Sequence, residues 1–261
     1  MRIEWLDEDR FRVGDLRFRY TRDYASVTTD EEIIILKERP FVESYVSLFE
    51  RERPKRLLEV GFFEGGSSLL WASLFPEMQI TAIDLRPISP TLESLAARFK
   101  NLQLRSPVAQ DDAAALAEIE KPNMVIDDAS HDYELTRRTF ELLFPRLAPG
   151  EKYVIEDWGW GHWPNWGEQW AEKPALSNLI VELTIAAASS PQWVERIEAD
   201  FRTATITRGT ARGQLSLDER WGARGRSLSL GLPQKPVAKG APRSWTARLA
   251  SALLPSAFNR R

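Results

Sequence analysis

Two acidic clusters, each at the end of a short apolar run, are the residues of this sequence best suited to chemistry. Asp127 and Asp128 end the first run, and His131 follows three residues after Asp128. Glu156 and Asp157 end the second run. Carboxylates that lie close together repel one another, so such a group either binds a cation or holds protons. An imidazole beside them is suited to take a proton near neutral pH.

The segment between these clusters indicates how the chain brings them together. Apolar residues recur at helical spacing across residues 133–144, and Pro149 with Gly150 marks the end of that helix. A strand, a helix and a second strand form a right-handed crossover with parallel strands, and ligands collect at the carboxyl ends of such strands. All four carboxylates should therefore meet at one sheet edge. The alternative is that these carboxylates only cap helices and solvate strand ends. That alternative explains a single acid as well as a shared site does, but it explains two acidic pairs and a histidine less well.

A glycine-rich turn earlier in the chain predicts a nucleotide-type pocket. The apolar run 56–60 leads into Gly61, and Gly65 and Gly66 precede an apolar helix whose first N–H groups are free for a ligand. A dinucleotide fingerprint would need a third glycine where Phe63 stands. The spacing found here, with an acid two residues before the first glycine and another glycine four residues after it, is typical of S-adenosylmethionine (SAM) methyltransferases. The alternative is a turn that serves packing alone.

The predicted cofactor site extends beyond this turn. Asp84 ends a second strand about 20 residues downstream, where a carboxylate can accept both ribose hydroxyls. Taken alone, Asp84 fits a helix cap equally well, but its order after the glycine turn favours the ribose. The segment from Gln110 to Asp112 follows a third strand and is placed at the adenine edge, with Asp111 as the expected ligand. The residues expected to bind the cofactor are Glu59, Gly61, Gly65, Ser67, Asp84, Asp111 and Asp127.

The remaining segments are expected to surround this sheet. Alternation across residues 11–20, broken by a glycine, predicts a β-hairpin outside the main sheet. A capping box from Thr29 to Glu32 predicts a helix toward Phe49 that Pro40 interrupts. Further expected elements are a tryptophan-rich loop at 158–170 beside the acids, a helix at 174–185 and closing strands at 193–198 and 201–207. The aromatic rings of that loop either hold a sugar ring or fold inward as a local core.

The composition restricts the class of protein. The 261 residues carry a net charge of −3 and 43% hydrophobic side chains, which suits one soluble catalytic domain. The absence of cysteine excludes a disulfide framework, a thiolate metal site and a cysteine nucleophile, and two histidines are too few for a three-histidine zinc site. The N-terminal residues are charged, and no apolar run approaches the roughly 18 residues of a membrane span. A cytoplasmic protein is therefore expected.

Charge is distributed unevenly along the chain. Residues 221–261 contain eight basic residues and no acidic ones, whereas residues 1–220 contain 27 basic and 38 acidic residues. The Gly, Ser and Pro content of the last segment is typical of a flexible tail. Near its end Trp245, Leu249 and Leu253 share one face of a short helical pattern. Such an end either contacts an anionic membrane or a partner chain, or is simply disordered.

The segments 128–131 (Asp-Ala-Ser-His) and 154–157 (Val-Ile-Glu-Asp) resemble the Asp-x-x-His and Glu-Asp motifs of a known family. This family comprises class I SAM-dependent O-methyltransferases of the macrocin and mycinamicin sugar-methylating kind, related to the cephalosporin hydroxylase-like family. The resemblance implies that Asp128, Glu156 and Asp157 bind Mg²⁺ (or Mn²⁺) and that His131 is the catalytic base. Oxygen ligands suit these cations better than zinc.

Together, the residues and the resemblance predict a doubly wound, mostly parallel, Rossmann-like sheet of seven strands with helices on both faces. The expected organisation is a hairpin extension at 1–28, a methyltransferase domain at 29–220 and a basic tail at 221–261. The expected activity is Mg-dependent O-methylation of a sugar or a glycosylated secondary metabolite. Three alternatives stay open: phenol or catechol O-methylation, a nicotinamide oxidoreductase, and a non-catalytic partner protein on the same scaffold. The expected partners are a small hydroxyl acceptor and further copies of the chain, and not nucleic acid.

Overall fold

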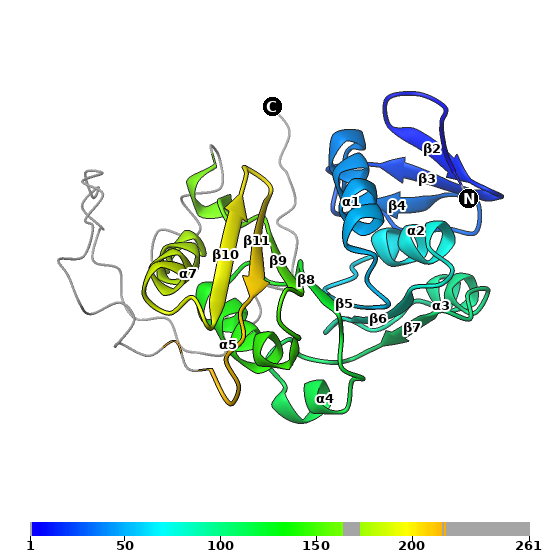
Figure 1. Cartoon of the computed structure of the whole chain (residues 1–261). Coiled ribbons are helices and arrows are strands. Elements are labelled where there is room, and N and C mark those ends of the chain that lie inside the picture. The colour runs from blue at the N-terminus through cyan, green and yellow to red at the C-terminus, as the bar shows by residue number, and fades with distance from the viewer. Residues whose placement is uncertain (1, 164–172, 216, 218–261) are drawn as a thin grey trace, which may run out of the picture. The chain divides into compact units, whose positions relative to one another are not determined.

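Two β-sheets organise the chain in a computed structural model, which describes residues 2–163, 173–215 and 217 (Figure 1). The elements follow in the order β1 (Ile3–Trp5), β2 (Arg10–Val13), β3 (Leu16–Tyr20), β4 (Ile33–Ile35), α1 (Arg39–Glu52), β5 (Arg56–Val60), α2 (Gly66–Leu74), β6 (Gln79–Ile83), α3 (Pro90–Ala96), β7 (Leu102–Arg105), α4 (Ala113–Ala117), β8 (Met124–Asp127), α5 (Tyr133–Leu143), η1 (Phe144–Arg146), β9 (Lys152–Glu156), η2 (Trp160–His162), α7 (Ser177–Ser189), β10 (Val194–Ala199) and β11 (Thr203–Arg208).

The larger sheet has seven strands in the order β10-β11-β9-β8-β5-β6-β7. The strands from β5 to β9 are parallel, whereas β11 is antiparallel to both of its neighbours. The predicted mostly parallel sheet is therefore confirmed. The strands β8 and β9 are neighbours, with Asp127 opposite Ile155, so the two acidic clusters leave the sheet side by side.

Helices cover both faces of this sheet, and successive strand residues point to opposite faces. Ile126 and Val154 belong to the core beneath α1, α2 and α3. Val125 and Ile155, one residue away in each strand, belong to the core beneath α4, α5 and α7. Burial on both faces explains why these strands read as continuous apolar runs instead of alternating ones.

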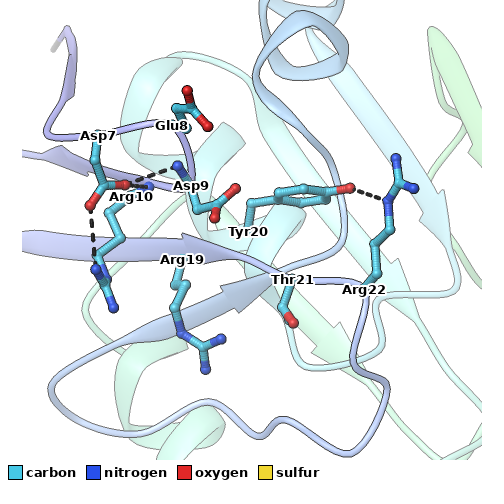
Figure 2. Close-up of a pocket in the computed structure, with 8 residues that line it drawn as sticks. All are labelled: Asp7, Glu8, Asp9, Arg10, Arg19, Tyr20, Thr21 and Arg22. Atoms are coloured by element: carbon cyan, nitrogen blue, oxygen red, sulfur yellow. Dashed lines mark hydrogen bonds and ion pairs between the residues drawn. The ribbon is translucent and has the colours of Figure 1, made fainter.

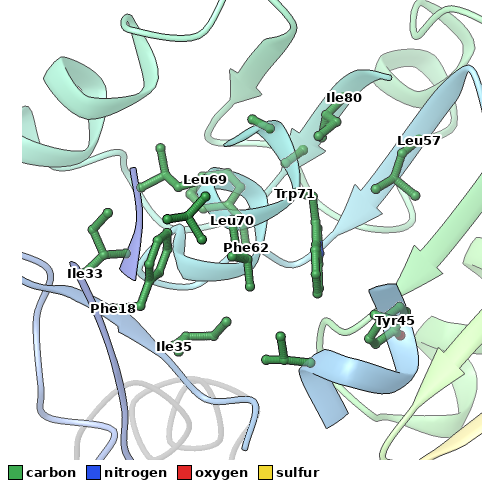
Figure 3. Packing of buried hydrophobic residues seen from close by; sticks show 14 of the residues in the cluster. Phe18, Ile33, Ile35, Tyr45, Leu57, Phe62, Leu69, Leu70, Trp71 and Ile80 are labelled. Atoms are coloured by element: carbon green, nitrogen blue, oxygen red, sulfur yellow. The ribbon is translucent and has the colours of Figure 1, made fainter. Parts of the chain in front are cut away.

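A second sheet of four strands, in the order β1-β2-β3-β4, packs against α2. The predicted hairpin is confirmed as β2 and β3, which lie outside the main sheet. Figure 3 shows Phe18, Ile33 and Ile35 of this sheet beside Leu69 and Leu70 of α2. All five side chains are buried, and full burial of each is worth about 1.5–3 kcal/mol. The small sheet is therefore part of the same hydrophobic core as the helices of the methyltransferase region.

The predicted helix from residue 29 to residue 49 is wrong in its first part. The backbone N–H of Glu32 donates to Thr29 Oγ1 at 3.1 Å, as in a capping box, but this contact closes a turn. The three isoleucines that follow form β4, parallel to β3, because consecutive β-branched residues favour a strand. Helix α1 begins only at Arg39, and Pro40 stands in its first turn, where a missing N–H removes no helical hydrogen bond.

Within residues 2–163, 173–215 and 217, no helix combines the length and the apolar character that crossing a membrane requires. The basic tail with Trp245, Leu249 and Leu253 lies outside these residues, as do Trp166 and Trp170 of the tryptophan-rich loop. Their predicted roles remain predictions.

Candidate active site

The four acidic side chains at the ends of β8 and β9 point in different directions. Asp127 lies on the face of the sheet that α5 covers. It is 2% exposed and accepts a hydrogen bond from the Tyr153 hydroxyl at 2.7 Å. Glu156 lies on the opposite face of the sheet and is 1% exposed. Asp128 and Asp157, each one residue beyond its strand, lie at the edge of the sheet, where both are only partly buried. The two predicted pairs are therefore each divided between the edge and the interior.

At the sheet edge, Asp128, Asp157 and His131 form a compact group. One potential ligand atom from each lies within 4.8 Å of the others, and His131 Nε2 is 3.8 Å from Asp128 Oδ1. The His131 imidazole packs edge-on against the Trp160 ring. The two ring centroids are 4.7 Å apart, and the ring planes meet at 70°. The structure thus brings the predicted base together with two of the three predicted metal ligands.

Two members of this group have a strained backbone. His131 has φ of 52° and Asp157 has φ of 51°, both in the left-handed region that non-glycine residues rarely adopt. Each such residue costs about 1–3 kcal/mol and persists where the surrounding structure holds it. The N–H of Asp157 donates to the carbonyl of Arg202 at 2.8 Å, which anchors one of them. Such strain is concentrated at functional sites, where it directs side chains.

Burial and crowding change the acidity of these carboxyl groups. Burial, and next the charge of Asp128, raise the pKa of Asp157 above its ordinary value. Burial raises the pKa of Asp127 to about 7, although the hydrogen bond from Tyr153 opposes the shift. Asp157 therefore stands where a bound cation would relieve repulsion, whereas Asp127 is an interior acid that needs no metal to explain it.

Lys37 is a residue of this site that the sequence interpretation missed. It lies between β4 and α1, and its Nζ is 2.7 Å from Asp128 Oδ2 and 2.6 Å from Glu156 Oε2. The other oxygen of Glu156 accepts a hydrogen bond from the Tyr45 hydroxyl at 2.7 Å. Burial acts to lower the pKa of Lys37, but the charges of Asp128 and Glu156 outweigh it and raise the pKa. The only signal in the sequence is a lysine that follows an apolar run, and no short-range spacing connects it to the acids.

The glycine turn after β5 is tightly enclosed. Gly61 has φ of 91°, and a Cβ there would lie 2.3 Å from the backbone oxygen of Asp128. A Cβ on Gly66 would lie 2.1 Å from the carbonyl oxygen of Ile34, in the small sheet. Gly65, with φ of 80°, is the N-cap of α2. The absence of a side chain at Gly61 therefore lets the backbone of Asp128, just after β8, lie against the turn. The absence of a side chain at Gly66 lets β4 pack against the start of α2.

Asp84, the predicted ribose ligand, holds this turn in place. Its Oδ2 accepts hydrogen bonds from the backbone N–H groups of Phe62 and Phe63 at 3.1 and 2.9 Å. Its Oδ1 accepts from the N–H of Arg86 at 2.8 Å. A carboxylate oxygen has two lone pairs, so at least one oxygen keeps capacity for a hydroxyl. The acid thus fixes the turn and remains able to accept a ribose hydroxyl.

Glu59 is fully buried beside the start of α2. Its Oε2 accepts a hydrogen bond from the Ser68 hydroxyl, whereas Oε1 has no hydrogen-bond partner among the described residues. Burial raises the pKa of Glu59, and the hydroxyls of Ser67 and Ser68 oppose the shift. A buried carboxylate oxygen without a donor is costly, and a ligand with a cationic N–H group would satisfy it.

The segment predicted at the adenine edge is hydrogen-bonded to Asp84, which holds the glycine turn, but its buried side chain is Gln110 and not Asp111. Asp111 is exposed in the turn before α4, and Val108 N–H donates to the Asp84 carbonyl at 2.9 Å. Gln110 is buried, and its Oε1 accepts from the N–H of Ser130 at 3.2 Å. Gln110, which belongs to the segment predicted at the adenine edge, therefore connects that segment to the loop that carries His131. Its contact with Ser130 was not predicted.

A second concave region lies on the small sheet, at some distance along the chain from these residues. It is a hollow of about 560 Å³ lined by Asp7, Glu8, Asp9, Arg10, Arg19, Tyr20, Thr21 and Arg22 (Figure 2). Arg10 pairs with Asp7, Arg19 with Glu32, and Arg22 donates to the Tyr20 hydroxyl. Because its arginines already have partners, we assign no ligand to this hollow.

The sheet order, the glycine turn and the acids at the sheet edge define a SAM-dependent methyltransferase fold. Comparison with known families agrees: residues 58–158 match the methyltransferase domain family Methyltransf_24. The described part of the chain therefore contains a methyltransferase domain. A putative caffeoyl-CoA O-methyltransferase from Staphylococcus aureus shares this fold, with a TM-score of 0.50 and 16% identity over 67% of this chain and 86% of that one.

Within this class, the chain is a distant homologue of the macrocin and mycinamicin sugar O-methyltransferases. It is 35% identical over 130 residues to the mycinamicin VI 2''-O-methyltransferase of Micromonospora griseorubida. The aligned residues are 46% of this chain and 31% of that enzyme. Demethylmacrocin O-methyltransferase of Streptomyces fradiae is 32% identical over 45% of this chain and 31% of its own length. The match thus spans about a third of these relatives.

A solved structure of a methyltransferase from the mycinamycin biosynthetic pathway also matches. It was determined in complex with Mg, SAH and mycinamycin VI. The TM-score is 0.53 and the identity 25%, over 67% of this chain and 51% of that one.

Proposed function

We propose that this protein is a SAM-dependent, divalent-cation-dependent O-methyltransferase that methylates a hydroxyl group of a sugar or of a glycosylated acceptor. The observation that carries the proposal is the group formed by Asp128, His131 and Asp157, whose potential ligand atoms lie within 4.8 Å of one another. The group stands at the ends of neighbouring parallel strands, directly beside the glycine turn. A base and oxygen ligands at this edge are what deprotonation of a hydroxyl beside a methyl donor requires.

The residues around the glycine turn are compatible with SAM. The buried Glu59 Oε1 has no donor among the described residues, and the α-ammonium group of the cofactor would supply one. Asp84 keeps acceptor capacity for ribose hydroxyls, and the start of α2 offers backbone N–H groups. Ser67, in the first turn of α2, is buried beside Glu59.

The donor set at the sheet edge is compatible with a hard divalent cation. Asp128 and Asp157 offer carboxylate oxygens, which Mg²⁺ and Mn²⁺ prefer. The charge of Asp128 helps to raise the pKa of Asp157, and a bound cation would remove this repulsion. Glu156, which the family resemblance includes among the ligands, is bound by Lys37 and Tyr45 in this structure.

The reaction requires a proton acceptor and a fixed acceptor hydroxyl. When bound, SAM supplies an electrophilic methyl group and the cation supplies Lewis acidity that favours the deprotonated oxygen. With SAM bound, the His131 imidazole would accept the proton of the acceptor hydroxyl as that oxygen takes the methyl group from the sulfonium, which would leave SAH. The negative charge of Asp128 lies 3.8 Å from His131 Nε2 and stabilises the imidazolium that forms. Trp160 packs on the imidazole and restricts its orientation.

The sugar acceptor is inferred from the relatives and from the aromatic loop. By their names, the relatives are O-methyltransferases of mycinamicin VI and of demethylmacrocin. Trp158 and Trp160 follow the acids in a loop, and loops commonly carry binding residues. The Trp158 indole N–H donates to the Asp200 carbonyl at 2.7 Å, which fixes one of these rings. Rigid aromatic faces suit a sugar ring or another partly apolar acceptor.

Transfer of a labelled methyl group from SAM tests this proposal. We expect incorporation into glycosylated macrolide-type acceptors, loss of incorporation with EDTA, and recovery with Mg²⁺ or Mn²⁺. A melting temperature that rises with SAM but not with NAD would separate this function from an oxidoreductase. Full activity in chelator would contradict the cation requirement, and transfer to catechols but not to glycosides would contradict the sugar acceptor.

A further inference from the structure

The contact between Lys37 and the two acidic strand ends goes beyond the function proposed above, on which the following inference rests. Lys37 comes from the link between the small sheet and α1, far in sequence from β8 and β9. Its side chain is 5% exposed, and its Nζ lies within 2.7 Å of Asp128 Oδ2 and within 2.6 Å of Glu156 Oε2. A buried ammonium between two carboxylates is a fixed positive charge inside the site.

Both oxygens of Glu156 are engaged on the α1 face of the sheet. Lys37 donates to Oε2 and the Tyr45 hydroxyl donates to Oε1, so the carboxylate is held away from the edge. Figure 3 shows Tyr45 near Trp71, and their ring centroids are 5.5 Å apart, which locks the tyrosine in the core. Asp128 is engaged by Lys37 through Oδ2, and its Oδ1 is the oxygen nearest to His131.

The position of Glu156 away from the sheet edge agrees with which side chains converge there as possible metal ligands. Among the described residues, the group that converges within 4.8 Å contains Asp128, His131 and Asp157 and does not contain Glu156. Strand geometry gives the reason: Glu156 is the last residue of β9 and continues its alternation, so its side chain follows Val154 into the core beneath α1. Asp157 is the first residue outside that alternation.

The charges balance when Lys37 is included. With all three carboxyl groups ionised, they and the Lys37 ammonium give the cluster two negative charges, which a single divalent cation neutralises. Without Lys37 the same cation would leave a negative charge uncompensated in a largely buried site, at a cost in desolvation.

We propose that Lys37 is a positioning residue that acts as a permanent counter-cation. Its ammonium group holds the Glu156 carboxylate in the interior, so that a divalent cation is bound by Asp128 and Asp157 and not by Glu156. The small N-terminal sheet thereby contributes a charge to the catalytic edge. Removing Lys37 and Glu156 together should leave this cation site intact, because the double change preserves both the net charge and the two ligands.

Binding of Mn²⁺ to metal-free protein, measured by calorimetry and by the loss of the free Mn²⁺ resonance signal, tests the proposal. The variants are the double variant Lys37→Met/Glu156→Gln and the matched ligand variant Asp157→Asn. We expect the double variant to bind one Mn²⁺ with the affinity of the wild type. Asp157→Asn should lose at least the roughly 10–100-fold that loss of a partner outside the ligand shell costs. Unfolding curves and circular dichroism would confirm that both are folded.

Different outcomes refute different statements. If the double variant loses Mn²⁺ affinity as Asp157→Asn does, Glu156 is a ligand and the present inference is overturned while the proposed methyltransferase stands. If the wild type itself binds no Mn²⁺, the cation requirement of the proposed function fails, and this inference fails with it. The single variant Lys37→Met supplies a second measurement. It should bind Mn²⁺ more tightly than the wild type because Glu156 is released, and weaker binding would count against the proposal.

Discussion

Replacement of Asp84 by alanine should weaken SAM binding and loosen the glycine turn at the same time. The carboxylate accepts three backbone hydrogen bonds, from the N–H groups of Phe62, Phe63 and Arg86 at 3.1, 2.9 and 2.8 Å. Its side chain is 11% exposed, so water can replace these bonds only in part. We expect the free energy of unfolding to fall by about 1–3 kcal/mol, the cost of leaving such groups without partners.

The loss of cofactor affinity should be similar in size but separable. A hydrogen bond from a ribose hydroxyl to a charged acceptor contributes about 1.5–3 kcal/mol, which corresponds to roughly 10–150-fold in Kd. Asp84→Asn distinguishes the two effects, because the amide oxygen can still accept from Phe62 and Phe63 while the charge is lost. We expect Asp84→Asn to retain more stability than Asp84→Ala and yet to bind SAM more weakly than the wild type.

Calorimetric titration with SAM and urea unfolding curves measure these two quantities. Asp15→Ala is the matched control, since Asp15 lies on the hairpin between β2 and β3 with a side chain that is 77% exposed. It should change neither value. If a folded Asp84→Asn variant binds SAM with wild-type affinity, the ribose does not contact Asp84 and the cofactor site must be placed elsewhere.

Three further predictions concern the base, the packing and the interior acid. His131→Ala should lower kcat by about 10²–10⁴ with little change in SAM affinity, whereas His162→Ala, the other histidine, should leave kcat near wild type; the reverse pattern would reassign the base. Gly66→Ala should lower the free energy of unfolding by about 1–3 kcal/mol, because its Cβ would meet the Ile34 carbonyl at 2.1 Å, while Gly159→Ala, whose nearest atom is 3.4 Å away, should be nearly neutral in urea unfolding. The pKa of Asp127 is raised to about 7, so its contribution to stability is present at low pH and is lost as pH rises through about 7; Asp127→Asn should abolish this part of the pH dependence, and unchanged unfolding curves between pH 5 and pH 8 would refute it.

The sequence, read together with its family resemblance, was sufficient to predict the mostly parallel seven-stranded sheet and the edge where the site lies. Apolar runs of strand length, a helical pattern between them and a glycine turn are local signals, and local signals decide element type and order. The acids after β8 and β9 were expected at one edge because parallel strands share their carboxyl ends. The helix predicted from residue 29 was wrong because a capping box followed by three isoleucines can close a turn before a strand as well as begin a helix.

Only the tertiary structure decided which acids converge and what neutralises them. The two-residue period of a strand sends Asp127 and Glu156 to opposite faces, but the sequence does not show where each strand ends, and one residue more or less would reverse the assignment. Lys37 reaches Glu156 across 119 positions of the chain, from a different sheet. Such a contact leaves no periodicity or spacing in the sequence, because it depends on how the small sheet and α1 pack onto the edge of β8 and β9.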